Sequence, residues 1–486
     1  MVEFITKVND AVNGFVWGIP ALTLLILTGV LMTVLTKVFQ VSHIGHWWKN
    51  TIGSIHKKSI TGHTKDKGSI SQFQALCTAL SATVGTGNIA GVAAAIATGG
   101  PGAVFWMWVA AFFGMMTNFS ENVLGIYYRR RNDKGEWSGG AMYYLRDGLG
   151  SYKGCKGLGK VLSVLFACFA ILASFGIGNM SQINSIASNM KSAFHIPGWV
   201  TGIALVIVGG LIIVGGLKRI AAVAEKVVPF MVVLYLIGSV IIIITQASFI
   251  GEAFKAIFAF AFGFRAVAGA AIGIAVKNAI TMGFKRGVFS NEAGLGSSVM
   301  VHSNSNVKEP VMQGMWGIFE VFADTMIVCT LTALVVLTSG FVDLQTGAML
   351  TASEETVLVA DAFAGVFGQA GRYFVAIAIL LFAFTTVLGW SHYGTKAWEY
   401  LFGTKATIYY KVFFVAFIIV GATMNLKLAW DLSDTFNGLM SIPNLIGVVS
   451  LAPLVVKITK NYVNRELKGG DDAPMLNIYE DAEAMK

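Results

Sequence analysis

The stretch LSATVGTGNIAGVAAAIATGGPG, residues 80–102, lies inside a run of residues apolar enough to cross a membrane. Its first half nevertheless holds Thr83, Thr86 and Asn88, with Gly85 and Gly87 between them. A helix in lipid satisfies its backbone polar groups internally, so weak helix formers at mid-span need a reason. An unwound turn here would expose carbonyls for a small cation and N–H groups for a carboxylate. The stretch therefore predicts a binding site made by the backbone of a broken helix.

Simple helix packing is the alternative interpretation of the same residues. Gly87 and Gly91 form a small-xxx-small pattern, which lets two helices approach closely. Packing alone does not account for the hydroxyl and amide side chains beside them, because polar groups at membrane depth face a cavity or a partner. We therefore favour the binding site.

The composition indicates an all-α polytopic membrane protein. The chain has 486 residues, of which 55% are hydrophobic and 13% are charged, whereas soluble domains are about 25% charged. Its four cysteines are scattered without metal-ligand or redox spacing. Apolar runs of about 20 residues recur and predict about eleven transmembrane helices. They lie near residues 14–38, 70–98, 102–129, 158–190, 197–217, 224–247, 252–284, 311–340, 371–402, 406–425 and 432–459.

The distribution of positive charge indicates how the chain is oriented in the membrane. Lysines and arginines fall in alternate gaps between the apolar runs, as cytoplasmic loops of membrane proteins do. With an odd number of crossings, this pattern predicts an N-terminus outside and a cytoplasmic C-terminus, in a multi-pass protein of the cell membrane. The net charge of +9 therefore reports orientation and implies no nucleic-acid partner, whereas the apolar runs imply contact with the lipid bilayer.

Eleven spans divide into one helix and two sets of five. We expect an N-terminal helix and cytoplasmic linker over 1–69, a first five-helix repeat over 70–250, a second over 251–460, and a disordered tail over 461–486. Because five is odd, the two sets enter the membrane from opposite sides, which is the signature of an inverted-repeat transporter. The second set would open with a glycine- and alanine-rich segment at 261–280.

Three motifs carry a resemblance to a known family. GGPGAVFWMWVAAFFG (99–114), ALSATVGTGNIAGVAAAI (79–96) and KRGVFSNEAGLGSS (285–298) resemble the alanine or glycine:cation symporter family, the sodium:alanine symporters. The likeness runs from about residue 15 to 460. It implies a LeuT-type fold of two inverted five-helix repeats preceded by one extra helix. It also implies sodium-coupled uptake of alanine or glycine into the cell.

The resemblance also implies a sodium site. Ser81 and Val84 would offer backbone carbonyls, and the segment LFAFTTVLGW (381–390) would add the hydroxyls of Thr385 and Thr386 with the carbonyl of Phe382. The alternative is that both threonines only bond back to carbonyls three or four residues earlier in their own helix.

The substrate would lie beside this ion. Thr83 and Asn88 resemble side-chain ligands, and Thr86 and Gly87 would present N–H groups to the substrate carboxylate. A second unwound turn at 270–273 would hold the substrate amine through its carbonyls. The other positions expected at the substrate site are Thr78, Gly85, Asn179, Ala270, Ala271, Ile272, Gly273 and Trp390. Gln182 shares a helix face with Asn179, and this face either borders the site or bonds to neighbouring helices.

Two carboxylates keep a proton-coupled amino-acid transporter open as the alternative function. Glu320 and Asp324 lie inside an apolar segment, where they either relay protons or form structural ion pairs. We favour structural pairing, with Arg265 or Lys277 as partner. The segment SNEAGLGSS (290–298) is expected to be an inner loop that helps to close a gate. No filter loop of a channel and no enzyme motif such as HExxH is found in the sequence.

Overall fold

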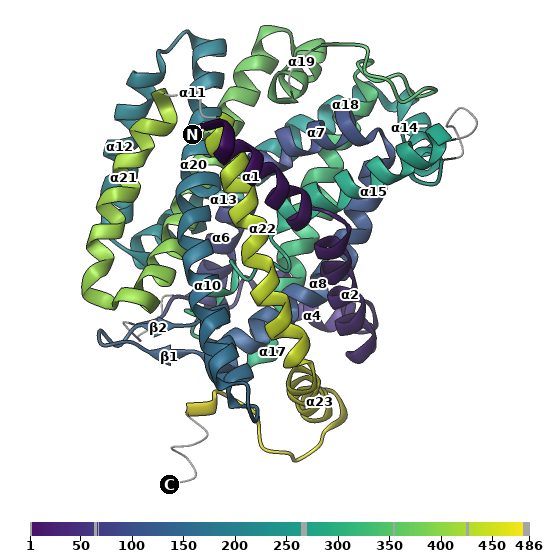
Figure 1. Cartoon of the computed structure of the whole chain (residues 1–486). Coiled ribbons are helices and arrows are strands. Elements are labelled where there is room, and N and C mark those ends of the chain that lie inside the picture. The colour runs from purple at the N-terminus through teal and green to yellow at the C-terminus, as the bar shows by residue number, and fades with distance from the viewer. Residues whose placement is uncertain are drawn as a thin grey trace.

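The computed structural model describes residues 2–62, 66, 68–263, 270–352, 355–423 and 427–479. These residues form a bundle of helices with one short β-hairpin, and the N-terminus and the C-terminus lie at opposite ends of the bundle (Figure 1). The chain enters through α1 (Val2–Val16) and α2 (Ile19–Leu35). Four short elements then precede the first repeat: α3 (Phe39–Ser42), α4 (Ile44–Asn50), η1 (Ile52–Ser54) and α5 (Lys58–Thr61).

The first core helix is interrupted where the sequence predicts it. Its first half, α6 (Gln72–Thr83), starts from a capping box between Ser71 and Gln74, which satisfies two N-terminal N–H groups. A 3₁₀ turn, η2 (Thr86–Asn88), follows, and the second half is α7 (Ala90–Gly99). The helix resumes because the alanine-rich sequence after residue 89 has high helix propensity.

The second interruption lies elsewhere than predicted. Ala270, Ala271, Ile272 and Gly273 form the first turn of the helix α15 (Ala270–Asn291), so the predicted unwound turn at 270–273 is wrong. Alanine and isoleucine tolerate a helix, and one glycine among them does not break it. The helix ends instead at Glu292, which has a φ of 56°, and positive φ values recur at Gly294 and Gly296 before α16 (Val299–His302). The segment 290–298 therefore contains the second interruption, and its expected part in closing a gate stays a prediction.

The remaining elements of the two halves complete the bundle. Those of the first half are α8 (Gly102–Tyr128), β1 (Arg130–Arg131), β2 (Trp137–Ser138), α9 (Ala141–Tyr143), η3 (Tyr144–Gly148), η4 (Leu149–Ser151), α10 (Lys156–Phe175), η5 (Gly176–Met180), α11 (Ser181–Phe194), α12 (Gly198–Val214), α13 (Leu217–Thr245) and α14 (Ala247–Ala261). Those of the second half are α17 (Pro310–Val321), η6 (Phe322–Cys329), α18 (Thr330–Thr338), α19 (Glu355–Phe367), α20 (Gln369–Phe402), η7 (Thr404–Ala406), α21 (Thr407–Thr423), α22 (Lys427–Ser450) and α23 (Ala452–Lys468). η3, η5 and η6 are π-helical turns.

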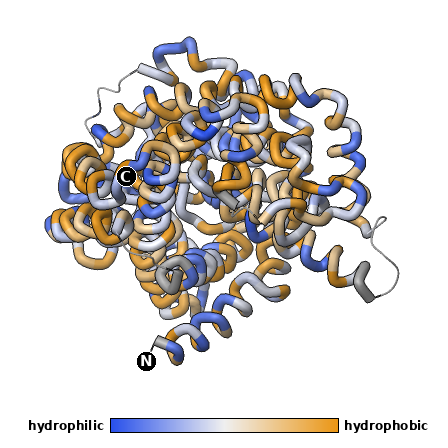
Figure 2. The backbone as a smooth tube through the Cα atoms, turned by 90° about the horizontal axis from the view of Figure 1, so that it is seen from above, coloured by the Kyte–Doolittle hydropathy of each residue, from blue (hydrophilic) through white to orange (hydrophobic). Residues whose placement is uncertain are grey.

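The helices pack in two groups. In the first group, α8 contacts α7, α15 and α17, which brings both interrupted helices together. In the second group, α10, α11, α12, α20 and α21 contact one another, and η3 packs on α10. Hydrophobic residues are spread along the tubes at the rim of the bundle as well as inside it (Figure 2). Large apolar side chains such as Leu211 and Ile244 are more than half exposed, as a surface in contact with lipid requires.

Within the described residues, seven helices are long and apolar enough to cross a membrane, or eight if the bent pair α22–α23 is one crossing. The interrupted helices are not among them. The halves α6 and α7 have only 12 and 10 residues, which is too short for a crossing, whereas α15 has 22 residues but carries the charges of Lys277, Lys285 and Arg286. The predicted count of eleven, which includes them, stays a prediction.

Candidate functional site

The backbone of the first interruption has lost the hydrogen bonds of a helix. The Gly85 N–H, which in a continuous helix would donate to the Ser81 carbonyl, donates instead to Asn88 Oδ1 (2.9 Å). The next N–H, of Thr86, points to Gln182 Oε1 (3.4 Å). The Ser81 carbonyl is thereby released at the end of a half-helix, where the helix dipole favours a cation.

A small cavity lies at this interruption, between the two groups of helices. Its volume is about 20 Å³, which is room for about one water molecule. The first group contributes residues at both interruptions, and the second contributes α11, α20 and the π-turn η5. The lining residues are Ala82, Thr83, Gly85, Gly87, Ile177, Gln182, Phe289, Glu292, Thr386, Trp390 and Asn437. Both interrupted helices therefore meet at one enclosed centre.

The predicted sodium hydroxyls lie against the first interruption. Thr386 donates to the Phe382 carbonyl (2.9 Å), and Thr385 donates to the carbonyls of Leu381 (2.9 Å) and Phe382 (3.0 Å). The bonds back into the helix are thus present, but each hydroxyl oxygen keeps lone pairs for a cation. A Cβ placed on Gly85 would come closer than 3.0 Å to Thr386 Oγ1, so the unwound turn and this hydroxyl are in direct contact. The carbonyls and hydroxyls present suit a hard cation such as sodium.

Four of the residues predicted for the substrate site line the cavity. Thr83, Gly85 and Gly87 belong to the first interruption, and Trp390 comes from α20. The indole of Trp390 packs directly on Gly178, where a Cβ would overlap it. The π-turn η5 that carries this glycine therefore lets the aromatic ring close one side of the cavity.

Thr78, Thr86, Asn88 and Asn179 are buried, but they do not line this cavity, and Gly273 is exposed on α15. The Thr86 hydroxyl donates to Gln182 Oε1 (3.1 Å), and Thr78 donates to the Gln74 carbonyl (2.7 Å). Asn179 Nδ2 donates to the Phe414 carbonyl (2.6 Å). Of the neighbouring pair on α11 and η5, it is Gln182 that reaches the site and Asn179 that bonds to the adjacent helix.

Asn88 acts as a brace that joins the first interruption to Asp324. Its Nδ2 donates to Asp324 Oδ1 (2.7 Å), while its Oδ1 accepts the Gly85 N–H. The other carboxylate oxygen of Asp324 accepts hydrogen bonds from the hydroxyls of Ser290 (2.7 Å) and Thr325 (2.8 Å). One carboxylate in the π-turn η6 thus connects both interrupted helices, and this oxygen-rich cluster is a second place that suits a cation.

Glu320 has a different partner from the one predicted. Its carboxylate lies 2.9 Å from His302 Nε2, and both side chains are fully buried. Asn118 Nδ2 donates to the same oxygen (3.4 Å). Lys277 is exposed on α15, and Arg265 lies outside the described residues. The predicted structural pairing is therefore made with histidine, and the predicted partner Lys277 is wrong.

Glu292 is a titratable residue that lines the cavity and was not among the predicted site residues. It is only 3% exposed, and its carboxylate accepts a hydrogen bond from Ser297 (2.5 Å). Its position follows from the left-handed backbone at residue 292. The sequence signal was the carboxylate followed by Gly294 and Gly296, because glycines at alternate positions are typical of an irregular turn.

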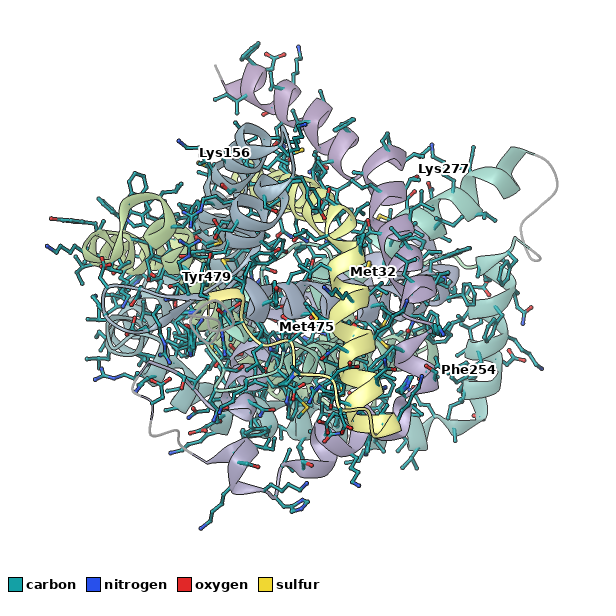
Figure 3. The ribbon with its side chains drawn as sticks, turned by 90° about the horizontal axis from the view of Figure 1, so that it is seen from below. Met32, Lys156, Phe254, Lys277, Met475 and Tyr479 are labelled. Carbon is teal, nitrogen blue, oxygen red and sulfur yellow. The ribbon has the colours of Figure 1, made fainter. Side chains whose placement is uncertain are left out.

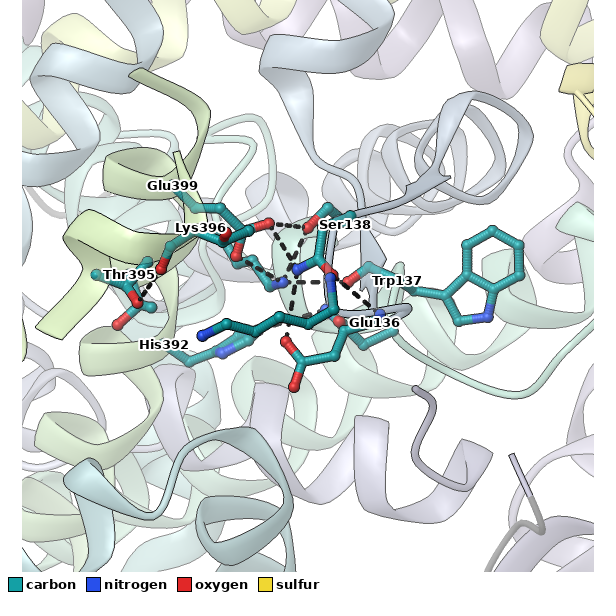
Figure 4. Close-up of polar contacts among 12 residues, drawn as sticks. Glu136, Trp137, Ser138, His392, Thr395, Lys396 and Glu399 are labelled. Atoms are coloured by element: carbon teal, nitrogen blue, oxygen red, sulfur yellow. Dashed lines mark hydrogen bonds and ion pairs between the residues drawn. The ribbon is translucent and has the colours of Figure 1, made fainter. Parts of the chain in front are cut away.

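A larger cavity of about 280 Å³ opens at the end of the bundle that carries the β-hairpin and the C-terminus, here called the hairpin face. α20 connects it to the central cavity, because His392 and Thr395 line the larger cavity two to five residues beyond Trp390. At its wall, Lys396 Nζ donates to the Trp137 carbonyl (3.1 Å), Ser138 Oγ (2.9 Å) and Glu399 (3.2 Å) (Figure 4). The hairpin that follows α8 is thus bound to α20.

Comparisons with known proteins show the family of this chain and, separately, its fold. A model of the sodium:alanine symporter family matches residues 2–476. The sodium/alanine symporter AgcS of Methanococcus maripaludis is 44% identical, over 95% of this chain and 98% of that one. The amino-acid carrier protein AlsT of Bacillus subtilis is 36% identical, over 83% and 82%. The solved structure of MhsT in complex with L-phenylalanine, with 14% identity and a TM-score of 0.52, covers 80% of this chain and 98% of its own, and shares the LeuT-type fold.

Proposed function

The chain belongs to the sodium:alanine symporter family, and from this premise we propose that it imports alanine and glycine together with sodium. The observation that carries the proposal is the meeting of two interrupted helices at one enclosed cavity. Broken helices at the middle of a membrane are where secondary transporters bind ions and substrates, because only there are backbone groups free to act as ligands. As a member of a transporter family, the protein is not an enzyme.

The proposed sodium site combines the released carbonyls of Ser81 and Val84 with the carbonyl of Phe382 and the hydroxyls of Thr385 and Thr386. Two observations support this site: the unwound turn contacts Thr386, and all five of these residues are buried. Sodium at this place would hold α6, which ends at the first interruption, against α20 of the second group. Occupancy by the ion would therefore favour the closed arrangement that the substrate needs.

The proposed substrate site is the cavity itself. The amide end of the second half-helix, at Thr86 and Gly87, suits the substrate carboxylate. The Glu292 carboxyl would face the α-ammonium group and, once ionised, would balance its charge. At about 20 Å³ the cavity is too small for any amino acid, so it must widen when the substrate enters. The bulky walls of Trp390, Phe289 and Ile177 would limit that widening, which is the basis for expecting alanine and glycine rather than larger amino acids.

We further propose that the hairpin face lies in the cytoplasm. The basic gaps in the sequence support this orientation, and the opposite positions of the two termini (Figure 1) agree with an odd number of crossings. The cavity of about 280 Å³ is then the inner vestibule, reached from the central cavity along α20. Movement of the two groups of helices relative to each other would open one end and close the other.

Uptake of labelled alanine into proteoliposomes tests the proposal. An inward sodium gradient should drive accumulation that potassium cannot replace, and unlabelled glycine should compete. Uptake without sodium, or failure of alanine to accumulate in a gradient of sodium, would reject it.

Proton coupling is the second candidate, and Glu292 at the cavity is the observation that favours it, because a proton site needs a titratable group. The same vesicles distinguish the two ions. With sodium absent on both sides, an inward proton gradient should drive no alanine accumulation if sodium is the coupling ion. Accumulation under that condition would show that protons drive uptake, with the buried carboxylates as the coupling groups.

A further inference from the structure

The C-terminal segment is bound to the bundle, although a disordered tail was predicted there. After α23, residues 473–479, here called the strap, cross the hairpin face, as the positions of Met475 and Tyr479 show (Figure 3). Asn461 on α23 fixes the start of the strap, because its side chain bonds to the Ala473 carbonyl (2.9 Å) and the Met475 N–H (3.3 Å). The apolar side chains of Met475 and Ile478 pack against the core.

Asn477 anchors the strap to the first group of helices. Its side chain is 1% exposed, and its Nδ2 donates to the carbonyls of Ile126 (3.1 Å) and Arg129 (2.7 Å). These carbonyls belong to the end of α8, where a helix has no backbone donors of its own. The Asn477 side chain therefore caps α8 from a distant part of the chain.

Tyr479 anchors the same strap to the second group. Its hydroxyl donates to Asp147 Oδ2 (2.8 Å) in η3, which packs on α10, and Arg130 donates to the hydroxyl (3.1 Å). Burial, followed by the hydrogen bond to Asp147, raises the pKa of Tyr479 to about 12, so the hydroxyl keeps its proton. Arg130, next to the end of α8, also forms an ion pair with Asp147.

We propose that the strap is a latch that holds the two groups of helices together at the hairpin face and opposes opening of the inner vestibule. Asn477 binds the end of α8, and Tyr479, two residues later, binds Asp147 in η3. The ion pair between Arg130 and Asp147 and the contacts of η3 with α8 already join these elements, and the strap adds two anchors, one of which must break if they move apart. The inference rests on the proposed alternating movement, in which this face must open to release substrate. The strap would thus regulate the opening of the hairpin face from outside the central site.

Two truncations form a matched pair for the test. One ends after Lys468 and removes the strap, while the other ends after Tyr479 and keeps both anchors. A full-length double variant, Asn477→Ala with Tyr479→Phe, removes the anchors without removing the segment. These three variants and the full-length chain all carry Thr395→Cys in the larger cavity, with Cys155 and Cys168 replaced by serine. The rate at which each of the four proteins reacts with a maleimide is measured in nanodiscs.

Removal of the strap, and the double variant, should raise the labelling rate at least fivefold, since each lost hydrogen bond to the anchors weakens closure by a few-fold. The truncation after Tyr479 should label like the full chain. Equal rates in all four proteins would overturn the latch. Because labelling needs no transported substrate, a failure of alanine uptake would count against the proposed function alone and leave this comparison intact.

Discussion

Adding one methyl group at Gly85 should specifically weaken sodium binding. A Cβ at this position would come closer than 3.0 Å to Thr386 Oγ1 and would also approach Gln182 Oε1 at 3.5 Å. Thr386 is 2% exposed and bonded into its own helix, so it cannot rotate into free space. The hydroxyl or the unwound turn must move away, and one proposed sodium ligand is lost in either case.

The magnitude follows from the value of one ligand. A polar contact to a charged group contributes about 1.5–3 kcal/mol, so the sodium concentration for half-maximal uptake in Gly85→Ala should rise about 10- to 150-fold. Gly91→Ala is the matched control, because a Cβ there meets nothing within 4 Å and alanine favours the surrounding helix α7 by about 1 kcal/mol.

Two assays should report the same difference. The first is sodium-dependent alanine uptake in proteoliposomes. The second is the rise in thermal midpoint of the purified protein with sodium, because a ligand that binds only the folded state stabilises it. If Gly85→Ala and Gly91→Ala have the same sodium dependence in both assays, the ion does not lie beside Thr386.

Four further outcomes are expected. Thr386→Val, which keeps the shape but removes the oxygen, should raise the half-saturating sodium concentration about 10-fold with unchanged expression; an unchanged value would place the ion elsewhere. Glu292→Gln should raise the alanine KM at least 10-fold at fixed sodium, and a normal KM would exclude pairing with the substrate ammonium. Leucine should compete with labelled alanine far more weakly than glycine, since each surplus methylene in a tight pocket costs about 1–3 kcal/mol; equal competition would contradict the small cavity. Burial raises the pKa of Asp147, but hydrogen bonds and neighbouring arginines outweigh this and hold the pKa below its ordinary 3.8. The stabilising charge of Asp147 is therefore present above pH 3.8 and is lost only as the pH falls through the lowered pKa. The ratio of the labelling rates of the two truncations at Thr395→Cys should accordingly be the same at pH 8 and pH 5.

Local sequence patterns were enough to predict the first interruption but not the second. At Gly85 and Gly87 weak helix formers and polar side chains coincide in one apolar run, and the helix breaks there. At 270–273 the same composition misleads, because alanine favours a helix. The true second break depends on the left-handed backbone of Glu292, which nothing in its immediate sequence except the following glycines indicates.

Contacts between residues that are far apart in the sequence could not be predicted from local patterns. Gln182 meets Thr86 from 96 residues away, and Asn88 meets Asp324 from 236 residues away. Periodicity places such residues on helix faces but does not say which face meets which. For the same reason a polar segment ending in Tyr479 looked disordered, although its amide and hydroxyl groups have partners in the folded bundle.

The strap also sets an order of assembly. The carbonyl of Arg129 is capped by a side chain that leaves the ribosome 348 residues later. At a synthesis rate of about 5–20 residues per second, that delay is roughly 20–70 s. During this interval the end of α8 must be hydrated at the membrane surface, and both groups of helices can insert and pack before the strap joins them. Closure of the hairpin face is thus among the last events in the making of the protein, and a nascent transporter passes through a stage in which its inner side is less restrained than in the finished molecule.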